Sequence, residues 1–92
     1  MTEIVYRLND EVHIEAFDEG ALVLRMPDRN IFQFNLTALK VLELTDGIRD
    51  VKGVSAIIAK DYQISQNEAV KDVLALYNHL LDQKIVEEVN YS

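Results

Sequence analysis

The N-terminal part of the fold is decided by residues 21–35, which read ALVLRMPDRNIFQFN. Two apolar runs flank Pro-Asp-Arg-Asn at 27–30, and this sequence favours a type I-like turn because Pro fixes φ while Asp and Asn tolerate the corner. After the turn, residues 31–34 alternate with period two, which places both phenylalanines on the same side. We therefore expect two antiparallel strands with one face against a core.

A third strand is predicted before this pair. Residues 12–17 alternate with period two, and Asp18-Glu19-Gly20 supplies turn chemistry before Ala21. The sequence thus predicts a three-stranded antiparallel meander whose last strand lies at the edge. Residues 4–8 are either an additional strand or part of an N-terminal arm over 1–9, and the pattern leaves both interpretations open.

Two helices are predicted directly after the meander. Asn35 can cap a first helix over 36–45, where leucine and valine recur at helical spacing, and Asp46-Gly47 ends it because glycine accepts a left-handed conformation. Asp50 can cap a second helix that ends near residue 61 or 62.

The longest helix is predicted over residues 66–83. Ser65 and Glu68 have the spacing of a capping box. The apolar positions of this helix cover an arc of about 160°, against roughly 100° for an ordinary one-sided helix. The apolar stripe is therefore wider than packing against one neighbour requires, and one flank of it is surplus. Residues 85–89 follow as a short strand-like tail. The predicted class is α+β, winged-helix-like, with an N-terminal three-stranded meander followed by three helices.

Length and composition restrict the function. The 92 residues predict a single domain over 1–92, and the absence of cysteine excludes disulfides and thiolate chemistry. The net charge of −7, with no clustered basic face, argues against nucleic acid as a partner. The N-terminus lacks the features of a signal peptide, and no stretch approaches the ~20 apolar residues that span a bilayer. We therefore expect a cytoplasmic protein that neither enters nor binds a membrane.

Candidates for catalysis are poor. The two histidines, His13 and His79, lie in unrelated contexts, and no nucleophile, metalloprotease or phosphate-loop motif occurs. His79 and Asp82 are three residues apart on the long helix but lack a third metal ligand, so His79 is interpreted as a solvated or flank-packed residue. The sequence predicts no enzyme activity, no metal and no cofactor.

The more informative pattern is an edge strand near a helix with a surplus apolar flank. Unpaired backbone groups of an edge strand can bind an incoming extended chain, and apolar pockets beside it can select side chains. The pattern is thus typical of a peptide-binding groove. The alternatives are that the first two helices use the whole stripe, or that a homodimer contact covers it.

Several short motifs, in their order, resemble the PqqD family. They are Phe34-Asn35, Leu42-Glu43-Leu44, Asp46-Gly47, Asp72-Val73 and Ile85-Val86, and the match covers roughly residues 10–88. This family comprises the peptide chaperones of coenzyme PQQ synthesis and the related RiPP recognition elements. The resemblance implies a winged-helix-like, non-catalytic protein that binds the leader of a ribosomally made precursor peptide. It also implies presentation of that peptide to a modifying enzyme, often a radical SAM protein.

In this family the leader adds as a strand to the third β-strand and packs against the third helix. Leu76 would then offer an apolar pocket, while Asp72 would meet a basic or N–H group, or serve only as a structural or exposed charge. Lys84 departs from the family, which commonly has glycine after the long helix, so the helix either turns through a costly left-handed residue or ends differently. The implied peptide-binding residues are Asn30, Ile31, Phe32, Gln33 and Phe34 on the strand, and Ala69, Asp72, Leu76 and His79 on the helix.

Two other functional classes fit a fold of this kind. A winged-helix DNA-binding regulator has the same elements, but its long helix would carry Lys71 against Glu68, Asp72 and Asp82, an acidic balance unsuited to a DNA groove. A dimerisation module would use the sheet face or the surplus flank of the long helix.

Overall fold

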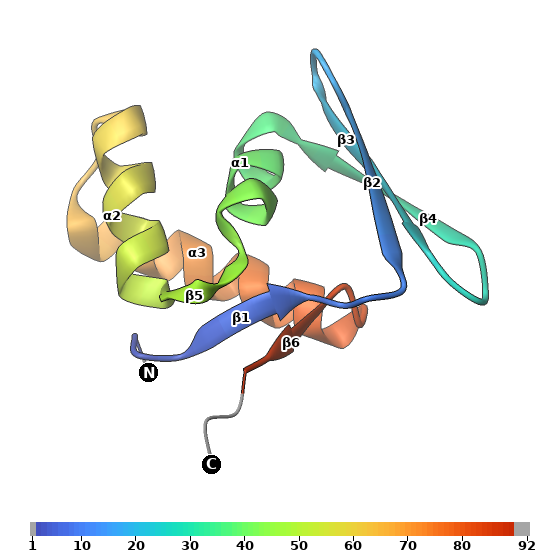
Figure 1. Cartoon of the computed structure of the whole chain (residues 1–92). Helices are drawn as coiled ribbons and strands as arrows, with labels where there is room; N and C mark the ends of the chain where they lie inside the picture. The colour runs from blue at the N-terminus through green and yellow to red at the C-terminus, as the bar shows by residue number, and fades with distance from the viewer. Residues whose placement is uncertain (1, 90–92) are drawn as a thin grey trace.

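The computed structural model describes residues 2–89 and contains two small sheets and three helices (Figure 1). Figure 1 shows the sheet β2–β3–β4 standing to one side of the helices, while the second sheet runs below α1 and α2 and in front of α3 in this view. The elements are β1 (Val5–Leu8), β2 (Val12–Phe17), β3 (Gly20–Arg25), β4 (Asn30–Asn35), α1 (Leu36–Leu44), β5 (Asp46–Asp50), α2 (Val51–Tyr62), α3 (Gln66–Asp82) and β6 (Val86–Glu88).

The predicted meander is confirmed. The strands β2, β3 and β4 form an antiparallel sheet in that order, with Ala21 opposite Phe34 and Arg25 opposite Asn30. The connection from β3 to β4 occupies residues 26–29, has a cis Met26–Pro27 bond and turns through a left-handed Arg29 at φ 62°. At the start of β3, Gly20 is required, since a Cβ there would lie 1.9 Å from the carbonyl oxygen of Phe34.

The second sheet was not predicted. It has the order β5–β1–β6, and β1 is its central strand, antiparallel to both neighbours. Residues 5–8 are therefore a strand and not an arm. Asp46 and Gly47 follow the end of α1 as predicted, and Gly47 has a left-handed φ of 79°, but the cap residue is Thr45 and both residues belong to β5. Tyr6 of β1 stacks on Tyr77 of α3 with ring centroids 4.2 Å apart, which joins this sheet to the long helix.

Helix α1 ends at Leu44, one residue earlier than predicted, because Thr45 closes it. The Thr45 hydroxyl donates to the carbonyl oxygen of Val41 at 2.6 Å and lies 2.7 Å from the Tyr77 hydroxyl. Because the Thr45 hydroxyl proton is donated to the Val41 carbonyl, the Tyr77 hydroxyl is the donor in its hydrogen bond with the Thr45 oxygen. Burial raises the pKa of Tyr77, which keeps the phenol in its protonated, donating form.

The predicted caps are present at all three helices. Asn35, Asp50 and Ser65 accept from the backbone N–H three residues later, at 2.9, 2.8 and 3.1 Å. The buried stripe of α3 consists of Ala69, Val73, Tyr77 and Leu80, which are at most 2% exposed. Leu76 lies beside this stripe and is only partly buried. The surplus flank predicted from the sequence therefore exists, and Leu76 belongs to it.

The C-terminus of α3 is closed by a Schellman motif centred on Lys84. The N–H of Lys84 donates to the Leu81 carbonyl at 3.0 Å, and the N–H of Ile85 donates to the Leu80 carbonyl at 2.9 Å. Lys84 has a φ of 58°, so the first of the two alternatives for this position holds: the chain takes the left-handed turn without glycine.

Replacing Lys84 with glycine is expected to raise the free energy of unfolding by about 0.5–1 kcal/mol, because glycine has no Cβ to disfavour the left-handed conformation. Urea denaturation measures the change. The matched control is Lys71→Gly, at an exposed position inside α3, which is expected to lower stability by about 1 kcal/mol. Equal destabilisation by both changes would contradict the assignment of strain to Lys84.

Candidate functional site

An open groove of about 540 Å³ lies between β4 and α3. One wall comes from the end of β4 and the first turn of α1, and the other comes from one face of α3. The lining residues are Gln33, Phe34, Asn35, Thr37, Ala38, Asp72, Leu76 and His79. The groove therefore lies where the edge strand and the surplus flank of the long helix were expected to meet.

Five of the nine predicted site residues line this groove. Gln33 and Phe34 come from β4, and Asp72, Leu76 and His79 come from α3. The His79 ring meets Phe34 edge to face, with centroids 6.3 Å apart and planes at 72°. This contact joins the two walls at one end of the groove.

Three predicted residues lie farther along β4. Asn30 is used locally, since its side chain donates to Asp28 at 3.1 Å. Ile31 is 65% exposed and lies with Leu22 and Leu24 on the other face of the sheet. The side chains of Asn30 and Ile31 thus lie outside the groove, while their backbone groups can pair with a ligand. The third residue, Phe32, packs against the core and under the Arg25 guanidinium.

The assignment of Ala69 to the groove does not hold. This residue is fully buried in the hydrophobic core and does not line the groove. Its place on the wheel of α3 is close to that of Leu76, but Ala69 is fully buried while Leu76 is only partly buried. The first turn of α1, with Thr37 and Ala38, was missed. The sequence signal for this turn was Asn35, which ends β4 and caps α1. A cap that directly follows an edge strand brings the next helical turn to the end of that strand.

The edge of β4 is open along the groove. Within residues 2–89, β4 pairs with β3 on one side and with no strand on the other. A row of backbone N–H and C=O groups is thus available for a further strand. The open edge and the groove lie side by side, so one extended chain can use both.

The charge of the groove is negative. Asp72 is exposed, and among the described residues its carboxylate has no hydrogen-bond or ion-pair partner. Asp72 therefore makes no structural hydrogen bond within residues 2–89, and its contact with a leader stays a prediction. A ligand that brings an N–H group or a basic side chain to this position would complement it.

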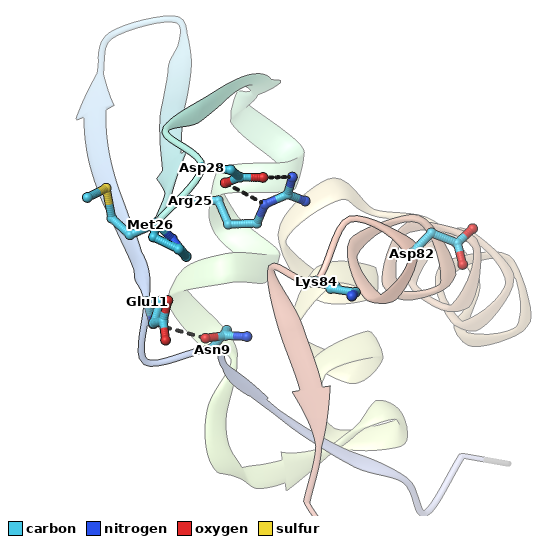
Figure 2. A pocket seen from close by; sticks show the side chains of 8 residues that line it. Asn9, Glu11, Arg25, Met26, Asp28, Asp82 and Lys84 are labelled. Atoms are coloured by element: carbon cyan, nitrogen blue, oxygen red, sulfur yellow. Dashed lines mark hydrogen bonds and ion pairs between the residues drawn. The ribbon is translucent and has the colours of Figure 1, made fainter.

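A second hollow, of about 410 Å³, lies at the other end of the sheet, where the turn after β3 meets the end of α3. Figure 2 shows Arg25 extending across it, paired with Asp28. The guanidinium also donates to the Gln83 carbonyl and lies 5.1 Å from the centre of the Phe32 ring. The hydrogen bond from Arg25 lowers the pKa of Asp28. Arg25 thus joins the sheet β2–β3–β4 to the C-terminus of α3.

Within the described part of the chain, no group of three or more His, Cys, Asp or Glu side chains could hold a metal ion. His79 and Asp82 gain no third ligand there. Among residues 2–89, none of the helices has the length and apolar composition that crossing a bilayer requires.

Three solved structures share this fold. The first is TbiB1 in complex with the TbiA(beta) leader peptide, with a TM-score of 0.81 and 14% identity, covering 94% of this chain and 98% of that one. The second is a lasso peptide synthetase B1 complexed with the leader peptide, with a TM-score of 0.79 and 21% identity. The match covers 89% of this chain and 96% of that one.

The third is the solution NMR structure of the PqqD truncation of Methylobacterium extorquens PqqCD, described as a functional, stand-alone RiPP recognition element. It has a TM-score of 0.76 and 25% identity, and the match covers 90% of this chain and 88% of that one. Among curated proteins, no sequence matches.

The sequence profile of coenzyme PQQ synthesis protein D (PqqD) matches residues 21–86. This range runs from β3, through the edge strand and all three helices, to the start of β6. It therefore includes every residue that lines the groove. By this match over most of its length, and by the fold it shares with a solved PqqD domain, the chain belongs to the PqqD family.

Proposed function

We propose that this protein is a non-catalytic recognition element for the leader region of a ribosomally made precursor peptide. The leader adds as an antiparallel or parallel strand to β4 and packs its side chains against α3. The observation that carries the proposal is the juxtaposition of the open β4 edge with a groove lined by Leu76, Asp72 and His79.

Two independent lines support this function. The groove has the two components that strand addition needs, an unpaired backbone edge for affinity and a side-chain hollow for specificity. In addition, two of the solved relatives are named as complexes with leader peptides, and the third is named as a recognition element.

The protein would act by raising the effective concentration of its peptide beside a modifying enzyme. The bound leader would be held on the recognition element, while the rest of the precursor would remain free to enter the active site of the enzyme. A radical SAM protein is the enzyme class that we propose as the partner. We also propose a cytoplasmic location, because ribosomally made precursors arise there.

The DNA-binding alternative has no supporting observation. The exposed face of α3 that would enter a DNA groove carries Glu68 and Asp72, and phosphates would be repelled by both. A homodimer remains a proposal of its own. Its surface would be the outer face of the sheet, where Leu22, Leu24 and Ile31 form an apolar hollow, and sedimentation over a range of concentrations tests it.

An amide-resolved NMR titration with the leader half of a candidate precursor peptide tests the proposed function. We expect shifts in residues 30–35, in the first turn of α1 and on the face of α3 that carries Asp72 and His79. The amides of β6 serve as the internal control, since this strand lies in the other sheet. Shifts confined to the outer face of the sheet, or shifts without saturation, would contradict strand addition to β4.

A further inference from the structure

A separate, smaller hollow continues the groove toward the junction of the three helices. It has a volume of about 240 Å³, and its walls are mainly apolar side chains of α1, α2 and α3. Three residues, Thr37, Asp72 and Leu76, line both the groove and this hollow, so the two spaces adjoin. The remaining lining residues are Val41, Ile58, Tyr62, Ile64, Glu68 and Val73.

The hollow has the size and the lining of a pocket for one side chain. Pockets for drug-sized ligands occupy roughly 300–1,000 Å³, and this space is smaller. Its base is formed by core residues such as Val41, Ile58 and Val73, which are at most 2% exposed. A bulky apolar side chain that enters it would leave water and contact these residues.

Two carboxylates stand at the mouth of this pocket. Glu68 and Asp72 are one helical turn apart on α3, and both are exposed. Ser65 accepts from the Glu68 backbone, but among the described residues the Glu68 carboxylate makes no return bond, so the capping box is only half formed. Within residues 2–89, no cationic side chain lines the pocket, and Lys40 of α1 is paired with Asp61 at 3.2 Å. The rim is thus negative and its charges are available.

We propose that this pocket is a specificity site that anchors a bulky apolar side chain of the leader next to a lysine or arginine, which pairs with Glu68 and Asp72. This inference rests on the proposed function. It commits to a peptide with these two features because the pocket is apolar, its rim is acidic, and it is continuous with the strand-adding groove.

The geometry of α3 sets the number of peptide residues between the pocket and the segment that pairs with β4. Along α3, His79 and Glu68 are eleven residues apart, which corresponds to about 16 Å at 1.5 Å per residue. An extended peptide covers this distance with about five residues. The apolar anchor and the basic residue therefore lie within about five residues of the segment that pairs with β4. They precede it in an antiparallel complex and follow it in a parallel one.

The test is selection of a randomised 12-residue peptide library on the full-length protein. We expect the retained peptides to combine a Leu, Ile, Met or Phe with a Lys or Arg within a few positions. For a retained peptide, alanine at the apolar position should weaken binding by about 10- to 100-fold, and glutamine at the basic position by about 3- to 10-fold. Isothermal titration calorimetry measures both.

The protein side is tested with the double variant Glu68→Gln/Asp72→Asn, whose side chains are exposed and keep their shape. Binding of a retained peptide should fall about 3- to 10-fold, and the loss should disappear when the basic residue of the peptide is glutamine. The matched control is Asp18→Asn/Glu19→Gln, which removes the same charge from the β2–β3 turn and should leave binding unchanged.

The outcomes separate this inference from the proposed function. Retained peptides without a basic residue, or equal binding by the wild type and the Glu68→Gln/Asp72→Asn variant, would overturn the specificity site while leaving peptide binding intact. Failure of the protein to retain any peptide would overturn the proposed function itself.

Discussion

Replacing Leu76 with aspartate is expected to weaken leader binding by about 10- to 100-fold while leaving the fold intact. Leu76 lines both the groove and the adjoining pocket, so a leader side chain that packs there would be brought against a desolvated carboxylate. The new charge also adds to that of Asp72, which lies one turn away. Fluorescence anisotropy with a labelled leader measures the affinity, and circular dichroism measures the helix content.

The matched control for Leu76→Asp is Asn78→Asp. Asn78 is exposed on a different face of α3 and lines neither the groove nor the adjoining pocket, yet the change adds the same single charge. Its affinity for the leader should remain within about twofold of the wild type. If both variants bind the leader as the wild type does, α3 is not a wall of the binding site.

Methylating one backbone nitrogen of the leader at a time is expected to give an alternating pattern of losses. In a strand added to β4, every second N–H of the peptide points toward β4 and the others point away. Methylation of an inward N–H removes a ladder bond and introduces a clash, so affinity should fall by about 100-fold. Methylation of an outward N–H should have little effect, and these positions serve as the control.

Strand addition is contradicted by a different pattern. Losses that repeat every three or four residues would indicate that the leader binds as a helix, because its contacts would then follow helical spacing. Uniformly small losses would indicate that side chains alone hold the peptide. Proline at the position facing Gln33 should reproduce the loss caused by methylation of an inward nitrogen there.

The elements that follow local rules could be predicted from the sequence. Asn35, Asp50 and Ser65 each cap the helix that was expected, because a cap is read from a few neighbouring residues. The meander was predictable for the same reason, since alternation and turn residues act over short distances.

The second sheet could not be predicted because its pairing is not local. Residues 46–50 contain a glycine and three charged residues and gave no strand signal. They form β5 because β1 lies beside them, and β1 is fixed in turn by β6 and by the stacking of Tyr6 on Tyr77. Tertiary context decides strand formation in such a segment.

The site was partly predictable for a related reason. The periodicity of α3 showed that its apolar arc was too wide, but it could not tell which flank the other helices cover. Ala69 and Leu76 lie about 20° apart on the helical wheel, yet Ala69 is fully buried in the core and Leu76 lines the groove. The resemblance to the PqqD family supplied the side of the helix, and tertiary packing decided the individual residues.

The open margin of β4 has a consequence for the protein when no peptide is present. Its sequence, NIFQFN, contains no charge and no proline, which are the features that usually prevent sheets from joining edge to edge. The unliganded molecule is therefore exposed to aggregation through this strand, and a bound peptide would cap it. The leader would then act as a solubilising partner for its own receptor, and the two are best produced together in the same cell.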